Sequence, residues 1–394
     1  MVSISMLFAV LLVVTGLGAF EYRRHLHNLN KIPIRIHVNG TRGKSSVTRL
    51  IAAGLSAGGI KVFAKTTGTV PRVITPEGDE FAVYRPSSPN IIEQLRVVDF
   101  ASHNGAEALV IECMALQPSY QSLCETKFVK STIGVITNAR ADHLDVMGPY
   151  EVDVAKALLG TTPVKGTLFT CEEDYVELFN YAGTDRGTSV VIVGNEISKK
   201  IPDEYMEGFT YIEHKENVAL ALAVCEKAGV TPEIAIKGMH KVFPDAGAMS
   251  EYRIEWFGRK IMFVNGFAAN DPESTEMIWN MAFERNPQIS KSIMIINCRA
   301  DRPERSDQIG NSVSGWKRAD IYLVVGTGTY VFVKAAVHSG VQASKIINVE
   351  DEDASKIFEK IIELSNGETL VMGVCNIKGA GLELVKYFAN RTYK

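Results

Sequence analysis

The sequence has little cysteine and no excess of basic residues, and both absences narrow what the chain can do. Its 394 residues include six cysteines, and no two of them stand in a Cys-x-x-Cys spacing. We therefore expect reduced thiols and no zinc cluster. The 42 Lys and Arg residues are offset by 45 Asp and Glu, which leaves a formal charge of −3. Without a basic surplus to collect a phosphate backbone, nucleic acid is not an expected partner.

The composition also lacks the extremes of disordered, collagen-like or multi-span membrane chains. Hydrophobic residues make up 46% and charged residues 22% of the chain, both close to the averages of globular proteins. At roughly 150 residues per domain, the length predicts about two to three domains. We expect a folded, soluble body with a sizeable core.

Charge is missing from the N-terminal stretch, because the first 20 residues contain no charged side chain. About nineteen helical residues span roughly 28 Å, close to the hydrocarbon core of a bilayer. Positive charge follows the stretch, at Arg23 and Arg24, which is the reverse of a secretory signal. We expect a single-pass anchor in the cell membrane over residues 1–21, a basic linker over 22–32 and a cytoplasmic body. The alternative is a long buried helix of a soluble domain.

Strand-like and helix-like segments alternate along the rest of the chain, which predicts an α/β fold with mostly parallel sheets. The expected strands are 34–38, 108–113, 132–137, 167–170, 190–193, 261–264, 292–296, 321–325, 345–349 and 369–374. Turn residues concentrate at 243–247, so we place a boundary near Gly247. A central domain is expected over 33–246 and a smaller α/β domain over 247–394.

The loop after the first expected strand carries the most specific local signal. Its residues 40–46 read GTRGKSS and open an expected helix. Glycines let backbone N–H groups surround phosphate oxygens, the helix N-terminus adds partial positive charge, a lysine reaches the terminal phosphates and a serine hydroxyl suits Mg²⁺. The loop therefore predicts a nucleoside triphosphate site. The first glycine of the general P-loop pattern is absent, because Val38 stands in its place.

Four segments resemble those of the Mur ligase superfamily of amide-bond-forming enzymes, and they occur in the same order. The first is the phosphate loop, and the second is a strand that ends at Glu112. The third is TNARADHLD at residues 137–145, and the fourth runs from His214 to Ala221. The resemblance implies a central P-loop ATPase domain with a mostly parallel sheet, followed by a smaller Rossmann-like C-terminal domain.

The resemblance also implies roles for individual residues, with ATP and Mg²⁺ as cofactors. The nucleotide is expected on Gly40, Thr41, Arg42, Gly43, Lys44, Ser45, Ser46, Asn138 and Asn217, the last at the adenine. Catalytic roles are expected for Lys44, Glu112 and His143, and metal ligation for Ser45, Glu112 and His143.

Three positions depart from the superfamily pattern or leave alternatives open. Where many members have an arginine at the domain boundary, this chain has Ala248. The usual ribose contact is replaced, and Asn265 or Asp271 is the candidate substitute. Lys156 stands near the spacing of a carbamylated, Mg²⁺-bridging catalytic lysine, and a plain solvent-facing lysine is the alternative.

Within the superfamily, the likeness over the whole chain is to the ligases that make poly-γ-glutamate, which start with a membrane anchor and share the segment around Thr67. Arg299, Asp301 and Arg302 crowd the end of a strand in the second domain. Guanidinium groups bind carboxylates bidentately, so we expect these residues, with Thr67, at the substrate.

The resemblance implies an ATP-dependent amide ligase that adds glutamate to a poly-γ-glutamate chain through an acyl phosphate, releasing ADP and phosphate. Its implied partners are glutamate, the polymer acceptor, small integral-membrane subunits of a synthase and export complex, and further copies of the chain as a homo-oligomer. The alternatives are a folylpolyglutamate- or cyanophycin-like ligase with a soluble acceptor, and a membrane-bound regulatory NTPase.

Overall fold

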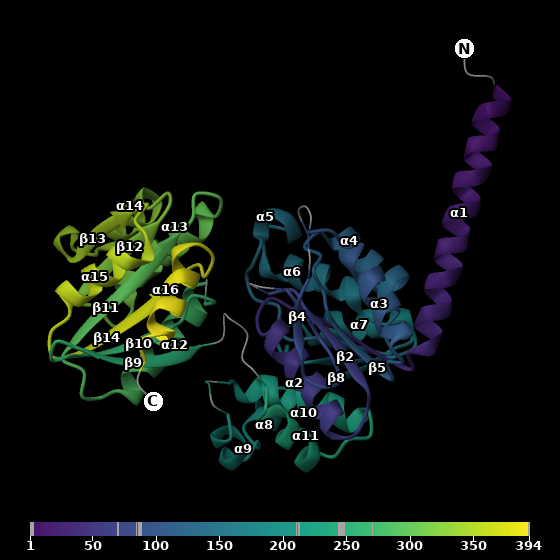
Figure 1. Cartoon of the computed structure of the whole chain (residues 1–394), viewed down its shortest axis with the longest axis horizontal. Helices are drawn as coiled ribbons and strands as arrows, with labels where there is room; N and C mark the ends of the chain where they lie inside the picture. The colour runs from purple at the N-terminus through teal and green to yellow at the C-terminus, as the bar shows by residue number, and fades with distance from the viewer. Residues whose placement is uncertain are drawn as a thin grey trace. The chain divides into compact units, whose positions relative to one another are not determined.

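The computed structural model describes residues 4–68, 71–83, 85, 89–209, 211, 213–242, 249–269 and 271–392. The chain divides into two compact units, Met1–Phe243 and Pro244–Lys394 (Figure 1). The boundary expected near Gly247, and the departure noted at Ala248, lie outside the described residues.

The first unit is built on an eight-stranded sheet in the order β4-β3-β2-β5-β1-β6-β7-β8. The strands are β1 Ile34–Asn39, β2 Val62–Thr66, β3 Arg72–Ile74, β4 Glu80–Ala82, β5 Ala108–Glu112, β6 Ile133–Ile136, β7 Thr167–Thr170 and β8 Ser189–Ile192. All pair in parallel except β3 and β4, which form an antiparallel edge beside β2. Because β1 lies between β5 and β6, the loops that follow these three strands meet at one edge of the sheet.

Helices cover both faces of this sheet. They are α2 Lys44–Ala57, α3 Glu93–His103, α4 Pro118–Leu123, the π-helix η1 Cys124–Val129, α5 Leu144–Met147, α6 Glu151–Leu158, η2 Leu159–Thr161, α7 Val176–Arg186, α8 Asn195–Ser198, α9 Asp203–Glu207, α10 Lys215–Lys227 and α11 Pro232–Met239. Helix α2 packs against α10 and α11, and its apolar residues share one core with theirs. A second core lies under α3.

Helix α1, Ile4–Lys31, projects from the first unit (Figure 1). Its apolar side chains, such as Leu12 and Phe20, are exposed, so it differs from the helix buried in a soluble domain that was the alternative expectation. By length and composition it can cross a membrane. The helix continues through the expected basic linker, where Leu29 is buried and Asn28 donates a hydrogen bond to Asp99 of α3 (2.7 Å).

The second unit has a six-stranded sheet in the order β13-β12-β11-β14-β10-β9. Its strands are β9 Ser250–Trp256, β10 Arg259–Asn265, β11 Lys291–Cys298, β12 Ile321–Gly326, β13 Ile346–Glu350 and β14 Glu368–Val374. Its helices are α12 Pro272–Arg285, α13 Pro303–Ser312, η3 Val313–Gly315, α14 Tyr330–Ser339, η4 Ala343–Lys345, α15 Ala354–Leu364 and α16 Ala380–Ala389. Only the edge strand β9 pairs antiparallel. The expectation of two α/β units with mostly parallel sheets is confirmed.

Candidate functional site

The phosphate loop connects β1 to α2 through two glycines in conformations that other residues rarely adopt. Gly40 has φ 131° and Gly43 has φ 78°. A Cβ atom on Gly40 would collide with the side chain and backbone of Thr137. The absence of a side chain therefore lets the loop lie directly against the chain that follows β6.

Asn138, in that following chain, fastens the loop. Its side-chain oxygen accepts hydrogen bonds from the Thr41 hydroxyl (2.6 Å) and the Arg42 N–H (3.1 Å). Its backbone carbonyl accepts another from the Thr41 N–H (3.1 Å). The sequence predicted Asn138 at the nucleotide; the structure shows it bonded to the phosphate loop, where it holds Thr41 and Arg42.

The first turn of α2 presents backbone N–H groups to the loop. Gly43 is the N-cap, and no side chain in the described part of the chain caps this helix. The ammonium group of Lys44 donates to the carbonyl of Gly40 (2.6 Å), so it lies over the loop. An uncapped helix N-terminus with a lysine beside it is suited to phosphate groups.

Glu112 ends β5 beside this loop and is 2% exposed. One of its carboxylate oxygens accepts hydrogen bonds from the Ser45 hydroxyl (2.8 Å) and the Thr67 N–H (2.7 Å). The structure thus brings together two predicted metal ligands and one predicted substrate residue, from three separate segments. A hydroxyl and a carboxylate are hard oxygen donors, and Mg²⁺ commonly takes only one or two protein groups besides phosphates and water.

His143 lies at the start of α5 with φ 50°, and its Nε2 is 3.9 Å from a carboxylate oxygen of Asp142. Asp142 also pairs with the guanidinium of Arg42 (3.3 Å). His143 is therefore linked to the phosphate loop through these two side chains. Within the described ranges, no three His, Cys, Asp or Glu side chains form a metal-binding group, so metal ligation by His143 stays a prediction.

Lys156 lies on α6 with its side chain 57% exposed, and its ammonium group pairs with Asp153 one turn earlier (3.3 Å). This environment is that of a solvent-facing helix lysine. Its carbamylation and catalytic role stay predictions.

Asn217, in the first turn of α10, reaches the phosphate loop from a distant part of the sequence. A Cβ atom on Gly43 would lie 2.7 Å from its side-chain oxygen. Its side-chain nitrogen donates to Glu213 (2.8 Å), which also accepts from the N–H of His214 (2.9 Å). Sequence reasoning missed Glu213. The signal that could have identified it is a glutamate four residues before Asn217, at the start of a helix.

The remaining predicted residues lie in the second unit. Asp271 is the N-cap of α12 and accepts a hydrogen bond from the Ser274 N–H (2.8 Å). Arg299 and Asp301, directly after β11, form a bidentate pair at 3.0 and 2.6 Å, and Arg302 is the N-cap of α13. A substrate carboxylate at Arg299 would therefore compete with Asp301.

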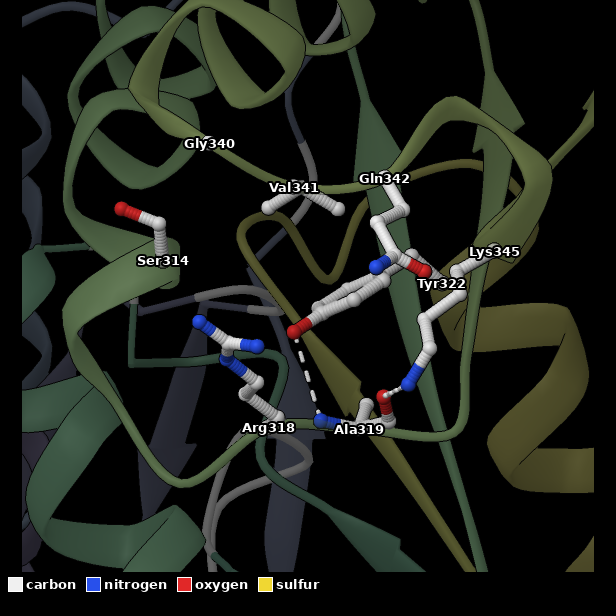
Figure 2. A pocket seen from close by; sticks show the side chains of 8 residues that line it. All are labelled: Ser314, Arg318, Ala319, Tyr322, Gly340, Val341, Gln342 and Lys345. Carbon is white, nitrogen blue, oxygen red and sulfur yellow. Dashed lines mark hydrogen bonds between the residues drawn. The ribbon is translucent and has the colours of Figure 1, made fainter.

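A cavity of about 50 Å³ lies near the amino ends of β12 and β13. Arg318, Tyr322 and Lys345 are among the residues that line it (Figure 2). Tyr322 is near the start of β12 and Lys345 directly precedes β13. Arg299, Asp301 and Arg302 follow the carboxyl end of β11 instead, so none of them lines this cavity.

Two buried ion pairs lie on the face of the first sheet opposite α2, and sequence reasoning missed both. Lys65 is fully buried and pairs with Glu93 of α3 (3.3 Å), and burial lowers the pKa of Lys65. His37 of β1 pairs with Glu125 of η1 (2.8 Å). Burial opposes the charged imidazole, but Cys113 and Glu125 outweigh that cost and raise the pKa of His37 to about 9.

Comparison with protein families divides the chain in the same way as its fold. Residues 38–243 match the Mur ligase middle domain, and residues 251–391 match the C-terminal domain of poly-gamma-glutamate synthase CapB. The capsule biosynthesis protein CapB of Bacillus anthracis is 39% identical over 370 residues, covering 93% of this chain and 79% of that protein. The PGA synthase CapB of Bacillus subtilis (strain 168) is 38% identical over 381 residues, covering 96% and 95%.

Solved structures show the same fold at low sequence identity. Escherichia coli FolC in complex with DHPP and ADP has a TM-score of 0.69 at 13% identity, and covers 94% of this chain and 91% of that one. The bifunctional folylpolyglutamate synthase/dihydrofolate synthase of Yersinia pestis, complexed with AMPPNP and Mn, has the same TM-score, identity and coverage.

Proposed function

Because the chain belongs to the Mur ligase family and is a homologue of the poly-γ-glutamate synthase CapB, we propose that it adds glutamate to a poly-γ-glutamate chain in an ATP-dependent reaction. The observation that carries this proposal is the convergence of four segments at the phosphate loop: the loop itself, Glu112, Asn138 and Asn217. The loop, Asn138 and Asn217 were expected at the nucleotide, and Glu112 was expected at the metal.

The residues at this loop fit ATP and Mg²⁺. The uncapped first turn of α2 and Lys44 would hold the terminal phosphates. Ser45 and Glu112, 2.8 Å apart, would hold the metal, which neutralises charge that moves between phosphate oxygens. At Gly40, where a Cβ atom would strike Thr137, the absence of a side chain lets the loop backbone keep this position.

The proposed chemistry makes a carboxylate reactive by phosphorylating it. The γ-carboxylate of the acceptor attacks the terminal phosphate of ATP, ADP leaves, and the acyl phosphate is then attacked by the amine of the incoming glutamate to give an amide and phosphate. Lys44 stabilises the charge on the transferring phosphate. Thr67, whose N–H donates to Glu112, is the proposed contact of the acceptor in this unit.

In the second unit, Arg299, Asp301 and Arg302 are the proposed site for the incoming glutamate. A bidentate Arg299–Asp301 pair keeps the guanidinium oriented, and a substrate carboxylate would replace Asp301 in an equivalent geometry. Asp271, which caps α12, is the proposed ribose contact.

We further propose that α1 anchors the chain in the cell membrane with both units in the cytoplasm. The exposed apolar side chains of α1 and the arginines that follow them support this orientation. The anchor favours an exported polymer over a soluble acceptor, and it suits a complex with small integral-membrane subunits and further copies of the chain.

Oxygen transfer tests the acyl phosphate directly. Glutamate and an acceptor, both labelled with ¹⁸O in their γ-carboxylates, are incubated with the full-length protein, ATP and Mg²⁺, and the inorganic phosphate is analysed by mass spectrometry. One ¹⁸O per amide bond should appear in phosphate. Label in AMP, or label retained entirely in the polymer, would contradict the proposed reaction.

A further inference from the structure

Glu213 lies outside the motifs discussed above, yet it contacts Asn217, a side chain that joins α10 to the phosphate loop. It directly precedes His214, the N-cap of α10. One carboxyl oxygen accepts hydrogen bonds from the His214 N–H (2.9 Å) and from the side-chain nitrogen of Asn217 (2.8 Å). Glu213 therefore bridges the backbone at the helix start and the asparagine one turn later.

These contacts fix which way the Asn217 amide faces. Its nitrogen must point to Glu213, because the opposite orientation would place two oxygens against each other. Its oxygen then lies against the loop, 2.7 Å from where a Cβ of Gly43 would stand. The asparagine thus presents a fixed acceptor, together with its second N–H, on the side of the phosphate loop.

We propose that Glu213 is a positioning residue that makes the nucleotide site select 6-aminopurine nucleotides over 6-oxopurine nucleotides. The inference rests on the proposed function, with Asn217 at the adenine as the resemblance to the Mur ligases implies. An asparagine pairs with adenine by accepting from the 6-amino group and donating to N7. Guanine carries an oxygen at position 6, which would face the fixed oxygen of Asn217 and repel it. An asparagine free to turn would donate to that oxygen and lose the discrimination.

The surroundings of Glu213 favour a fixed orientation of the Asn217 amide. Burial raises the pKa of Glu213, and the side chains facing it are Tyr211, His214 and Asn217. In the protonated form its carbonyl oxygen still accepts from Asn217. A glutamine at this position keeps an acceptor oxygen at the same reach, whereas an aspartate is one methylene shorter and an alanine removes the acceptor.

The test is equilibrium binding, which needs no catalysis. Full-length protein in detergent micelles is titrated with ribose-labelled fluorescent ADP and GDP in Mg²⁺, and the ratio of the two Kd values is measured. The wild type should prefer ADP. In Glu213→Ala the ratio should fall by about tenfold or more, since one bidentate base contact discriminates by at least that much. Glu213→Gln should keep the wild-type ratio.

The controls separate orientation from fold. Asn217→Ala should lose the same preference, and Glu216→Ala, at an exposed glutamate in the same turn, should keep it. If Glu213→Ala does not fold, Glu213→Asp takes its place and should also lose the preference. A preference unchanged in Glu213→Ala or Glu213→Asp but lost in Asn217→Ala overturns the inference alone. A wild type that binds neither nucleotide overturns the proposed function as well.

Discussion

Side chains beside the phosphate loop hold it in shape before any ligand is considered. Asn138 bonds to two consecutive loop residues, and Thr137 packs where a side chain on Gly40 would stand. Glu112 draws the Ser45 hydroxyl and the Thr67 N–H to one carboxylate oxygen. Preorganisation of this kind lowers the cost of ordering the site when the nucleotide binds.

Glu112→Gln should raise the Mg²⁺ concentration needed for ATP turnover by about tenfold or more, because it removes the charge of a metal ligand. The fold should persist, since the amide oxygen still accepts a hydrogen bond from Thr67. The half-maximal Mg²⁺ concentration is measured together with the melting temperature. Glu177→Gln, at an exposed glutamate of α7, is the control. Equal Mg²⁺ requirements in the wild type, Glu112→Gln and Glu177→Gln would contradict metal binding by Glu112.

The buried His37–Glu125 pair predicts a dependence of stability on pH. Against the cost of burial, interactions with Cys113 and Glu125 raise the folded-state pKa of His37 from 6.5 to about 9, so their contribution to stability is complete below about pH 6.5 and is lost as the pH rises through 9. The loss is at most about 3 kcal/mol in the free energy of unfolding. Urea titrations between pH 6 and 10 should show this decline in the wild type and not in His37→Gln. The stability of His103→Gln, at an exposed histidine, should decline as in the wild type. A wild type that keeps its stability to pH 10 would contradict the raised pKa of His37.

At the scale of elements, the order of the strands explains why distant motifs meet. With β1 between β5 and β6, the phosphate loop, Glu112 and residues 137–143 follow neighbouring carboxyl strand ends. Helix α10 then crosses α2 and delivers Asn217. Local sequence predicts none of these contacts by itself.

Gly43→Ala tests whether the loop needs its close approach to α10. The substitution combines a positive φ with a clash against Asn217, so ATP affinity should fall by about tenfold or more. Gly59→Ala is the matched control, because Gly59 has φ +82° and no neighbour within 4 Å. Both should lose about 1 kcal/mol or more of stability from backbone strain, but only Gly43→Ala should bind ATP weakly. Equal ATP affinity in the two variants would contradict the proposed contact.

The sequence predicted ten of the strands that the structure describes, with ends within two residues of those observed. It did not predict β2, β3, β4 or β9. The short strands β3 and β4 and the half-exposed edge strand β9 carry no continuous apolar run, and in the buried strand β2 only residues 62–64 are apolar, before Lys65 and Thr66. The resemblance to the Mur ligases implied that Glu112 and Asn217 lie near the phosphate loop. The partners of buried charges, such as Glu93 for Lys65 and Glu125 for His37, depend on tertiary packing and leave no local pattern.

Helix α1 gives a topology prediction. A cysteine introduced at Ser3 should react with a membrane-impermeant thiol reagent in intact cells, and one introduced at Asn30 should not, because the positive charges after the span stay in the cytoplasm. The unsubstituted protein is the background control, since its six native cysteines are free and five of them are buried. Labelling at Asn30 without labelling at Ser3 would reverse the orientation.

At the scale of the whole molecule, the proposed phosphate contacts and the proposed glutamate contacts lie in different units. The first unit holds the phosphate loop and the proposed metal ligands, and the second holds the arginines proposed for glutamate. Arg299→Ala should accordingly leave ATP affinity unchanged and raise the KM for glutamate. Lys44→Ala should weaken ATP affinity and leave the KM for glutamate unchanged. A joint loss of both affinities in either variant would contradict this division of the site.

The proposed ligase reaction is tested by measuring glutamate-dependent ADP release together with the γ-linked product. Membranes that contain the full-length chain and its co-expressed membrane partners are supplied with ATP, Mg²⁺ and L- or D-glutamate. The wild type should release one ADP for each γ-linkage that forms. In Lys44→Ala and His143→Ala both products should fall by about 100-fold or more, at unchanged protein levels. Lys199→Ala, at an exposed lysine, should match the wild type. Near wild-type ADP release with glutamate in both Lys44→Ala and His143→Ala would contradict the proposed ligase reaction.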